Sequence, residues 1–212
     1  MEYVKTIYNF KHLFFDFDGV LFNSNKIRTK GFKIIFKEFP KTLVDKIIDY
    51  HEINGGLSRY HKIRYFFENI LNKDISDQLL QTYANEYRKV MAKELFDEKL
   101  KISDSINFLK TKRNKFVKIF IVSGSDQNEL RSLCEFLDIK DLFNGIYGSP
   151  IAKNDLVKNI LKKNSIKLKD CCLIGDSLND KEAALINGIT FFAYNNHKLN
   201  EYYTIKTFAS LI

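Results

Sequence analysis

Two aspartates lie close together near the N-terminus, directly after a short apolar run. Residues 13–15 are bulky and apolar with no polar alternation, which predicts a buried strand, and Asp16 and Asp18 follow them. Gly19 comes next and supplies the backbone freedom for a sharp exit and a close approach to a ligand. Because ligands of open parallel sheets bind outside the carboxyl ends of the strands, we expect both carboxylates at the mouth of a site.

Two carboxylates held this close cannot both ionise at low cost. We therefore expect one member of the pair to have a raised pKa and the other to stay charged. A charged carboxylate beside a protonated one suits a nucleophile that works with a general acid. The alternative is that Asp16 and Asp18 only cap turns or helices.

Three further groups of polar residues follow in chain order. Ser123 ends the apolar run 120–122, Lys153 comes next, and residues 175–180, Gly-Asp-Ser-Leu-Asn-Asp, follow the apolar run 172–174. Together with the aspartate pair, this set resembles the four motifs of the haloacid dehalogenase superfamily of phosphohydrolases: DxD, a Ser or Thr, a Lys, and an acidic pair of the GDxxxD type. The resemblance covers nearly the whole chain. It is specific because the motifs occur in the right order and three of them close strand-like runs.

The resemblance implies roles for the aspartate pair. Asp16 would be the nucleophile that attacks phosphorus and forms an aspartyl-phosphate. Asp18 would be the general acid for the leaving alcohol and afterwards the base for water. Dehalogenases of the superfamily carry another residue at this second position, so the presence of Asp18 argues against carbon–halogen chemistry.

The resemblance also implies a divalent cation, with Mg²⁺ expected. Its ligands would be the carboxylates of Asp16 and Asp176 and the backbone carbonyl of Asp18, while Asp180 would support this shell or bind through water. If Asp18 is protonated, the other three carboxylates are balanced by Mg²⁺ and Lys153; without the ion, an incoming phosphate would meet net negative charge. Asp176 and Asp180 also suit the N-terminus of the following helix, which is compatible with the metal role.

The remaining motif residues would hold the phosphate. Ser123 would donate its hydroxyl to a phosphoryl oxygen, and the backbone N–H of Gly124 would add to the anion cradle. Lys153 would act as a point charge on the phosphate and on the nucleophile. Lys158 is an alternative, because Asn154 stands where a proline commonly follows the motif lysine, but the upstream Gly-Ser-Pro sequence favours Lys153 by spacing.

A helical insert separates the first motif from the others. Apolar residues recur at helical spacing through 25–97, whereas helix and strand patterns alternate from 98 onward. Such alternation predicts a parallel sheet covered on both faces. We therefore predict an α/β fold in which residues 1–24 and 98–212 form a Rossmann-like core and 25–97 form an inserted α-helical cap. The resemblance implies that this cap is mobile over the site; the alternative is a purely structural helical layer.

The insert contains candidate substrate-binding residues. Residues 55–59, Gly-Gly-Leu-Ser-Arg, resemble the glycine loop of β-phosphoglucomutase-like caps. The resemblance makes Arg59 a candidate to bind an anionic or hydroxyl-rich remote group of the substrate, with Lys62 and Arg64 as helpers. The alternative is a solvated arginine in the first turn of a helix. The histidines, His51 among them, show no ligand spacing, so we expect them to be structural or exposed.

Composition limits the classes of partner. The 212 residues carry a formal net charge of +8, but the lysines are scattered and no nucleic-acid module is present, so we expect small phosphorylated metabolites and no nucleic acid. The three cysteines form no CxxC motif, which indicates a reducing compartment. No apolar run approaches the ~20 residues that span a bilayer, and the N-terminus lacks a signal core. We expect a cytoplasmic monomer or weak dimer.

These patterns together predict Mg²⁺-dependent hydrolysis of a small phosphomonoester, such as a sugar phosphate or a phosphoglycolate-like acid. A β-phosphoglucomutase-type phosphotransferase is the alternative, since it would use the same residues but return the phosphate to a reoriented sugar. Sequence spacing does not separate the two. A non-catalytic binding protein of the same fold is more remote, because the full motif set argues against it.

Overall fold

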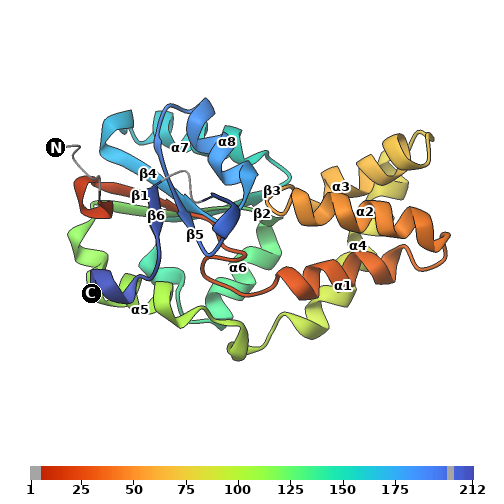
Figure 1. Cartoon of the computed structure of the whole chain (residues 1–212), viewed down its shortest axis with the longest axis horizontal. Helices are drawn as coiled ribbons and strands as arrows, with labels where there is room; N and C mark the ends of the chain where they lie inside the picture. Colours follow the sequence, from red (N-terminus) through yellow and green to blue (C-terminus); the bar gives the residue numbers. More distant parts are fainter. Residues whose placement is uncertain (1–5, 200–202) are drawn as a thin grey trace.

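The core of the protein is a parallel six-stranded sheet (Figure 1), described here from a computed structural model that covers residues 6–199 and 203–212. The strand order is β3-β2-β1-β4-β5-β6, and every neighbouring pair is parallel. Phe15 in the central strand is in register with Ile121 and Ile174, so three strands reach the same edge together. The strands are β1 (His12–Phe15), β2 (Lys118–Asp126), β3 (Gly145–Ser149), β4 (Cys171–Gly175), β5 (Thr190–Tyr194) and β6 (Tyr203–Ile205).

Helices cover both faces of this sheet because both faces are apolar. Phe14 and Phe15 are adjacent in β1 and point to opposite sides, where each joins a separate buried cluster. Helices α7 and α8 pack on the Phe14 side, and α5 and α6 pack on the Phe15 side (Figure 1). This arrangement confirms the predicted α/β fold. The core helices are α5 (Ser103–Lys112), α6 (Gln127–Phe136), α7 (Lys153–Lys163) and α8 (Leu178–Ile186).

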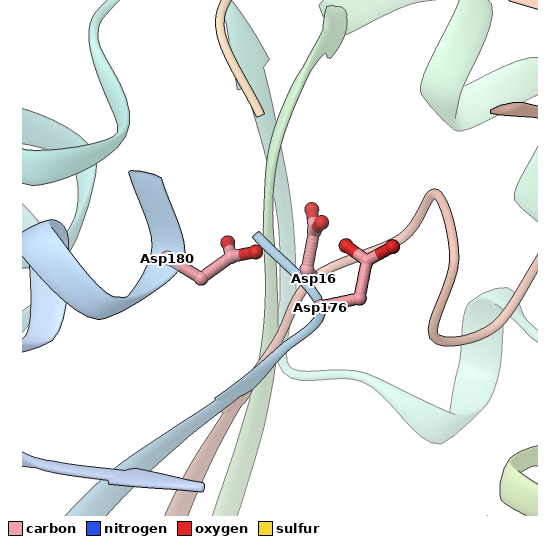
Figure 2. A group of neighbouring side chains, drawn as sticks. All are labelled: Asp16, Asp176 and Asp180. Carbon is pink, nitrogen blue, oxygen red and sulfur yellow. The ribbon is translucent and has the colours of Figure 1, made fainter. Parts of the chain in front are cut away.

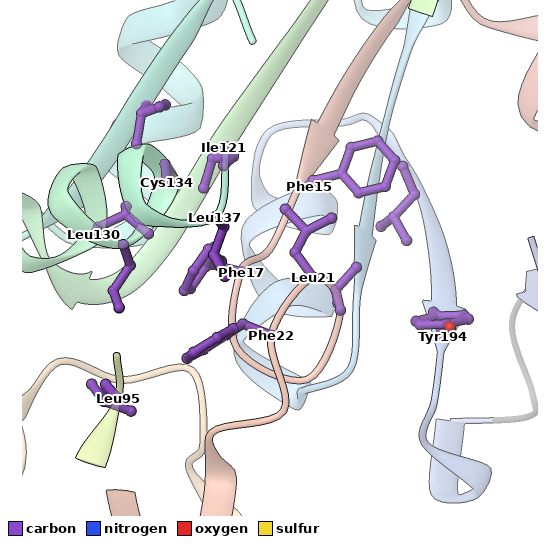
Figure 3. Close-up of a cluster of buried hydrophobic side chains, with 14 of the residues drawn as sticks. Phe15, Phe17, Leu21, Phe22, Leu95, Ile121, Leu130, Cys134, Leu137 and Tyr194 are labelled. Atoms are coloured by element: carbon purple, nitrogen blue, oxygen red, sulfur yellow. The ribbon is translucent and has the colours of Figure 1, made fainter. Parts of the chain in front are cut away.

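The loop after β1 is fixed by two phenylalanines (Figure 3). Phe17 and Phe22 are fully buried and stack with ring centroids 5.3 Å apart. Burial of each ring contributes about 2–3 kcal/mol. Because successive side chains of extended backbone alternate in direction, the inward Phe17 leaves Asp16 and Asp18 on the opposite side, towards the end of the sheet.

Four helices between β1 and β2 form a lobe beside the sheet (Figure 1). The side chain of Ser58 accepts a hydrogen bond from the His61 N–H at 3.2 Å, so Ser58 caps the helix that follows it. Aromatic rings fill the lobe, with Phe36 and Phe66 only 4.0 Å apart. Among the described residues, no helix of either lobe has the length and apolar character needed to cross a membrane. The helices are α1 (Asn25–Ile35), α2 (Lys41–Ile53), α3 (Arg59–Tyr65), which continues into a π-helical turn (Phe66–Ile70), and α4 (Asp77–Glu94).

Candidate active site

Three aspartates converge at the carboxyl ends of β1 and β4 (Figure 2). The Asp16 N–H donates to the Ile174 carbonyl at 2.9 Å, which extends the pairing of these strands by one residue. One carboxylate oxygen from each of Asp16, Asp176 and Asp180 lies within 4.8 Å of the others. Hard oxygen ligands at this spacing suit a divalent cation such as Mg²⁺. The residues predicted as metal ligands from separate motifs therefore lie together.

Gly19 permits the loop after Asp18 to press against this cluster. Its φ is +82°, in the left-handed region, and a Cβ added there would lie 1.9 Å from Asp176 Oδ2. Any other side chain would displace the Asp176 carboxylate. The sequence predicted a close approach to a ligand at Gly19, and the structure shows that the neighbour is a candidate metal-binding carboxylate.

Lys153 lies at the first turn of α7 and contacts two of the aspartates. Its Nζ is 2.8 Å from Asp16 Oδ1 and also donates to Asp180 Oδ1. Burial lowers the pKa of Lys153, but the carboxylates of Asp16 and Asp180 outweigh burial and leave this pKa above its ordinary value. Lys158, the alternative, is exposed on the same helix. The structure therefore places Lys153, and not Lys158, beside the candidate nucleophile.

Both carboxylate oxygens of Asp180 accept hydrogen bonds from other residues of the protein. One of its oxygens accepts from Lys153, and the other accepts from the Ser177 N–H at 3.0 Å and the Ser177 hydroxyl at 2.6 Å. Ser177 in return caps α8, so the two residues form a capping box. Asp180 thus orients both Lys153 and the start of α8, while Asp16 and Asp176 keep more of their oxygen surface for a cation.

Asp18 is held by cationic and hydroxyl donors. Arg28 Nε donates to Asp18 Oδ1 at 2.8 Å, and the hydroxyls of Ser24 and Ser125 donate to the same carboxylate. Burial alone would raise the pKa of Asp18, but Arg28 and the two hydroxyls outweigh it and lower this pKa. Asp18 is therefore ionised in this arrangement. The local sequence gave no sign of these contacts, because Ser125 reaches Asp18 only when β1 and β2 pair, and Arg28 only when α1 packs against the core.

Asp16 has the opposite shift. Burial and the neighbouring carboxylates of Asp180 and Asp176 raise its pKa well above the ordinary value, although Lys153 opposes them. Burial and Asp180 likewise raise the pKa of Asp176 to about 7. The expectation of a charged Asp16 beside a protonated Asp18 is wrong for this arrangement, and Arg28 beside Asp18 is the physical reason. The raised pKa of Asp16 and of Asp176 shows that neighbouring positive groups do not balance the negative charge of these two carboxylates. A bound Mg²⁺ would supply the missing positive charge.

Ser123 and Gly124 lie in the carboxyl-terminal part of β2, beyond the residues that pair with β1. Ser123 is buried, and its Oγ accepts from the Ser125 N–H at 3.1 Å. A Cβ added at Gly124 would lie 2.2 Å from the Gly56 carbonyl oxygen, so the glycine loop of the helical lobe sits directly on this end of the sheet. Both residues line a cavity of about 670 Å³, which Asp16 and Asp18 also line.

The helical lobe closes the other side of this cavity. Arg59 lines it, but its Nη2 is 2.6 Å from Glu129 Oε1, and Arg28 Nη1 is 2.9 Å from the same oxygen. Glu129 belongs to α6 of the core, and its partners belong to α1 and α3. Sequence patterns did not single out Glu129. Arg64 pairs with Glu68 and Asp77 and does not line the cavity.

Comparisons with known proteins agree with the geometry. The family model of haloacid dehalogenase-like hydrolases matches residues 13–194. The chain belongs to this family. The match spans all four motifs as well as the helical insert. A search of curated proteins found no match to the sequence.

Solved structures share the fold at low identity. A haloacid dehalogenase-like family hydrolase from Streptococcus pneumoniae is 20% identical with a TM-score of 0.69, over 96% of this chain and 97% of that one. A predicted phosphoglycolate phosphatase from Haemophilus somnus is 16% identical with a TM-score of 0.72, over 96% of each chain. A β-phosphoglucomutase from Clostridium difficile is 16% identical with a TM-score of 0.76, over 96% and 93%. These likenesses establish the core and its inserted helical cap.

Proposed function

We propose that this family member is a Mg²⁺-dependent phosphatase that hydrolyses a small phosphomonoester through an aspartyl-phosphate on Asp16. The observation that supports it best is the contact of Lys153 with Asp16, whose carboxylate lies beside that of Asp176, since both aspartates line the cavity between the core and the cap. Mg²⁺ held by Asp16 and Asp176 would neutralise the charge of the phosphate. The phosphatase and phosphoglucomutase among the similar structures agree with phosphoryl chemistry in general.

In the proposed reaction, Asp16 and Asp18 act in each of two steps. In the first step a bond forms between an oxygen of Asp16 and phosphorus, the bond to the substrate oxygen breaks, and Asp18 gives its proton to the leaving alcohol. In the second step water attacks phosphorus, Asp18 takes the proton of the water, and the carboxylate of Asp16 leaves. Ser123 and the backbone N–H of Gly124 hold the phosphoryl oxygens throughout.

Asp18 must gain a proton before it can act as an acid. Arg28 and two hydroxyls hold it ionised while the cap lies against the core. Because Arg28 belongs to the first turn of the cap, any movement of α1 away from the core removes the guanidinium from Asp18. Loss of the guanidinium would raise the pKa of Asp18, while water admitted by the same movement would remove the effect of burial, so this pKa would return towards its ordinary value. The position of the cap therefore changes how strongly Asp18 holds a proton in this proposal.

Hydrolysis of an aryl phosphate by the purified protein is the direct test. We expect turnover with Mg²⁺, loss of turnover in excess chelator and its return when Mg²⁺ is added again. Full turnover in excess chelator would refute the metal site. No hydrolysis under any metal condition would favour a non-catalytic binding protein of the same fold.

A β-phosphoglucomutase-type reaction is the second candidate, because a cavity of about 670 Å³ has room for a sugar phosphate to reorient. An assay that separates free phosphate from isomerised sugar phosphate distinguishes the two. A small phosphorylated metabolite as substrate, no nucleic-acid partner, a cytoplasmic location and a monomeric or weakly dimeric state all belong to the proposal.

A further inference from the structure

The cap side of the cavity contains a buried lysine with neutral partners. Lys62 in α3 is 2% exposed and lines the cavity. Its Nζ is 2.9 Å from His51 Nδ1 and 3.1 Å from the Gly55 carbonyl oxygen. Among the residues that the structure describes, no carboxylate forms an ion pair with Lys62. A lysine is almost never buried in this way unless it is paired.

The groups around Lys62 do not compensate its charge. Burial and the charge of Lys62 lower the pKa of His51 to about 3, so the imidazole is neutral and its Nδ1 accepts the hydrogen bond. Burial and then Arg28 lower the pKa of Lys62 to about 7, with Lys153 acting in the same direction. Asp18 opposes them, but its carboxylate is already bound to Arg28. The amine therefore lies in positive surroundings.

The other buried cations of the site have carboxylate partners. Lys153 contacts Asp16, and Arg59 contacts Glu129. Arg28 contacts Asp18 through Nε, yet its Nη2 is buried without any hydrogen-bond partner. Arg28 lines the same cavity as Lys62. Lys62 and Arg28 therefore each retain an N–H group on the cap side that no described residue of the protein accepts from.

We propose that Lys62, positioned by His51, and the Nη2 of Arg28 bind a second anionic group of the substrate while its phosphoryl group lies at Asp16. This inference rests on the proposed function, because it assigns the other end of the molecule hydrolysed there. The preferred substrates are then phosphomonoesters that carry a carboxylate or a second phosphate. Arg59 differs from Lys62 because Glu129 already balances its charge.

The test uses phosphonates, which bind without being hydrolysed. Phosphonoacetate, phosphonopropionate and phosphonobutyrate carry a carboxylate, and alkylphosphonates of equal length, which lack that carboxylate, serve as matched controls. Calorimetry in Mg²⁺ measures binding to the wild-type protein, to Lys62→Met and to Lys46→Met, a control at an exposed position on α2. We expect at least one carboxylated member to bind about tenfold more tightly than its match. Lys62→Met should lose this preference, and Lys46→Met should keep it.

The proposal is overturned if the wild-type protein binds every pair equally, or if Lys62→Met retains the preference. Lys62→Gln, checked by circular dichroism, replaces Lys62→Met if the latter does not fold. Aryl phosphate hydrolysis is measured on the same preparations. A wild-type protein that hydrolyses the aryl phosphate but shows no preference among phosphonates refutes the role of Lys62 alone, whereas one that hydrolyses nothing refutes the proposed function.

Discussion

Replacement of Lys62 by methionine measures the cost of its buried charge. The pKa of this amine falls from an ordinary value of 10.5 to about 7. At 1.36 kcal/mol per unit, this difference corresponds to about 5 kcal/mol of destabilisation while the amine is charged in both the folded and the unfolded state. Above pH 7 the unfolded state holds a proton that the folded state has lost, so the stability of the wild-type protein must rise with pH.

The difference in free energy of unfolding between the wild-type protein and Lys62→Met is expected to change with pH. Relative to Lys62→Met, the wild-type protein should gain about 2 kcal/mol in free energy of unfolding between about pH 7 and about pH 9. Urea unfolding followed by circular dichroism at a series of pH values gives this difference. Lys46→Met, at an exposed position, should run parallel to the wild type. A Lys62→Met profile that also runs parallel to the wild type would show that the pKa of Lys62 is not depressed, and would refute the reasoning.

The remaining predictions concern other charged residues. Asp16→Asn should lower aryl phosphate turnover at least about a thousandfold while the protein stays folded; unchanged turnover would exclude Asp16 as nucleophile. Glu129→Gln should cost about 3–5 kcal/mol in urea unfolding, because it leaves two buried arginines short of negative charge, whereas Glu135→Gln at an exposed position should cost little; equal effects would contradict this. Asp104 accepts from the N–H groups of Phe208 and Ala209, and these bonds lower its pKa against burial. Its contribution should therefore be present at neutral pH and lost as the pH falls through the lowered pKa; Asp104→Asn should speed amide exchange at both N–H groups, and unchanged exchange would exclude the contact.

The sequence predicted well what depends on local pattern and strand direction. Short apolar runs identified strands whose carboxyl ends carry Asp16, Ser123 and Asp176. Parallel pairing then brings these residues together without further information, because Phe15 is in register with Ile121 and Ile174. The spacing that favoured Lys153 over Lys158 agrees with the geometry for a similar reason, since only the first turn of α7 faces the end of the sheet.

The sequence did not predict contacts made when the lobes pack together. Arg28 and Glu129 are 101 positions apart, and neither lies in a motif or an apolar pattern. The contact of Arg28 with Asp18 lowers the pKa of Asp18, so the assignment of the charged and the protonated aspartate was wrong although the pair was identified correctly. His51 was expected to be structural or exposed; it is buried, and its role as a partner of Lys62 follows from the packing of α2 against α3.

The contacts between the cap and the core favour one position of the cap but do not hold the cap tightly against the core. Glu129 of the core accepts from Arg28 and Arg59, one from each of two cap helices, so a small shift of either helix breaks a bond to the same oxygen. The attraction of buried charges is largely offset by the water they lose, and opening the cap returns that water to all three residues. The glycine contact between Gly56 and Gly124 adds close fit but little apolar area. Contacts of this kind fix the geometry of the cavity, yet breaking them costs much less free energy than their number suggests, as the proposed phosphatase would require in order to admit its substrate.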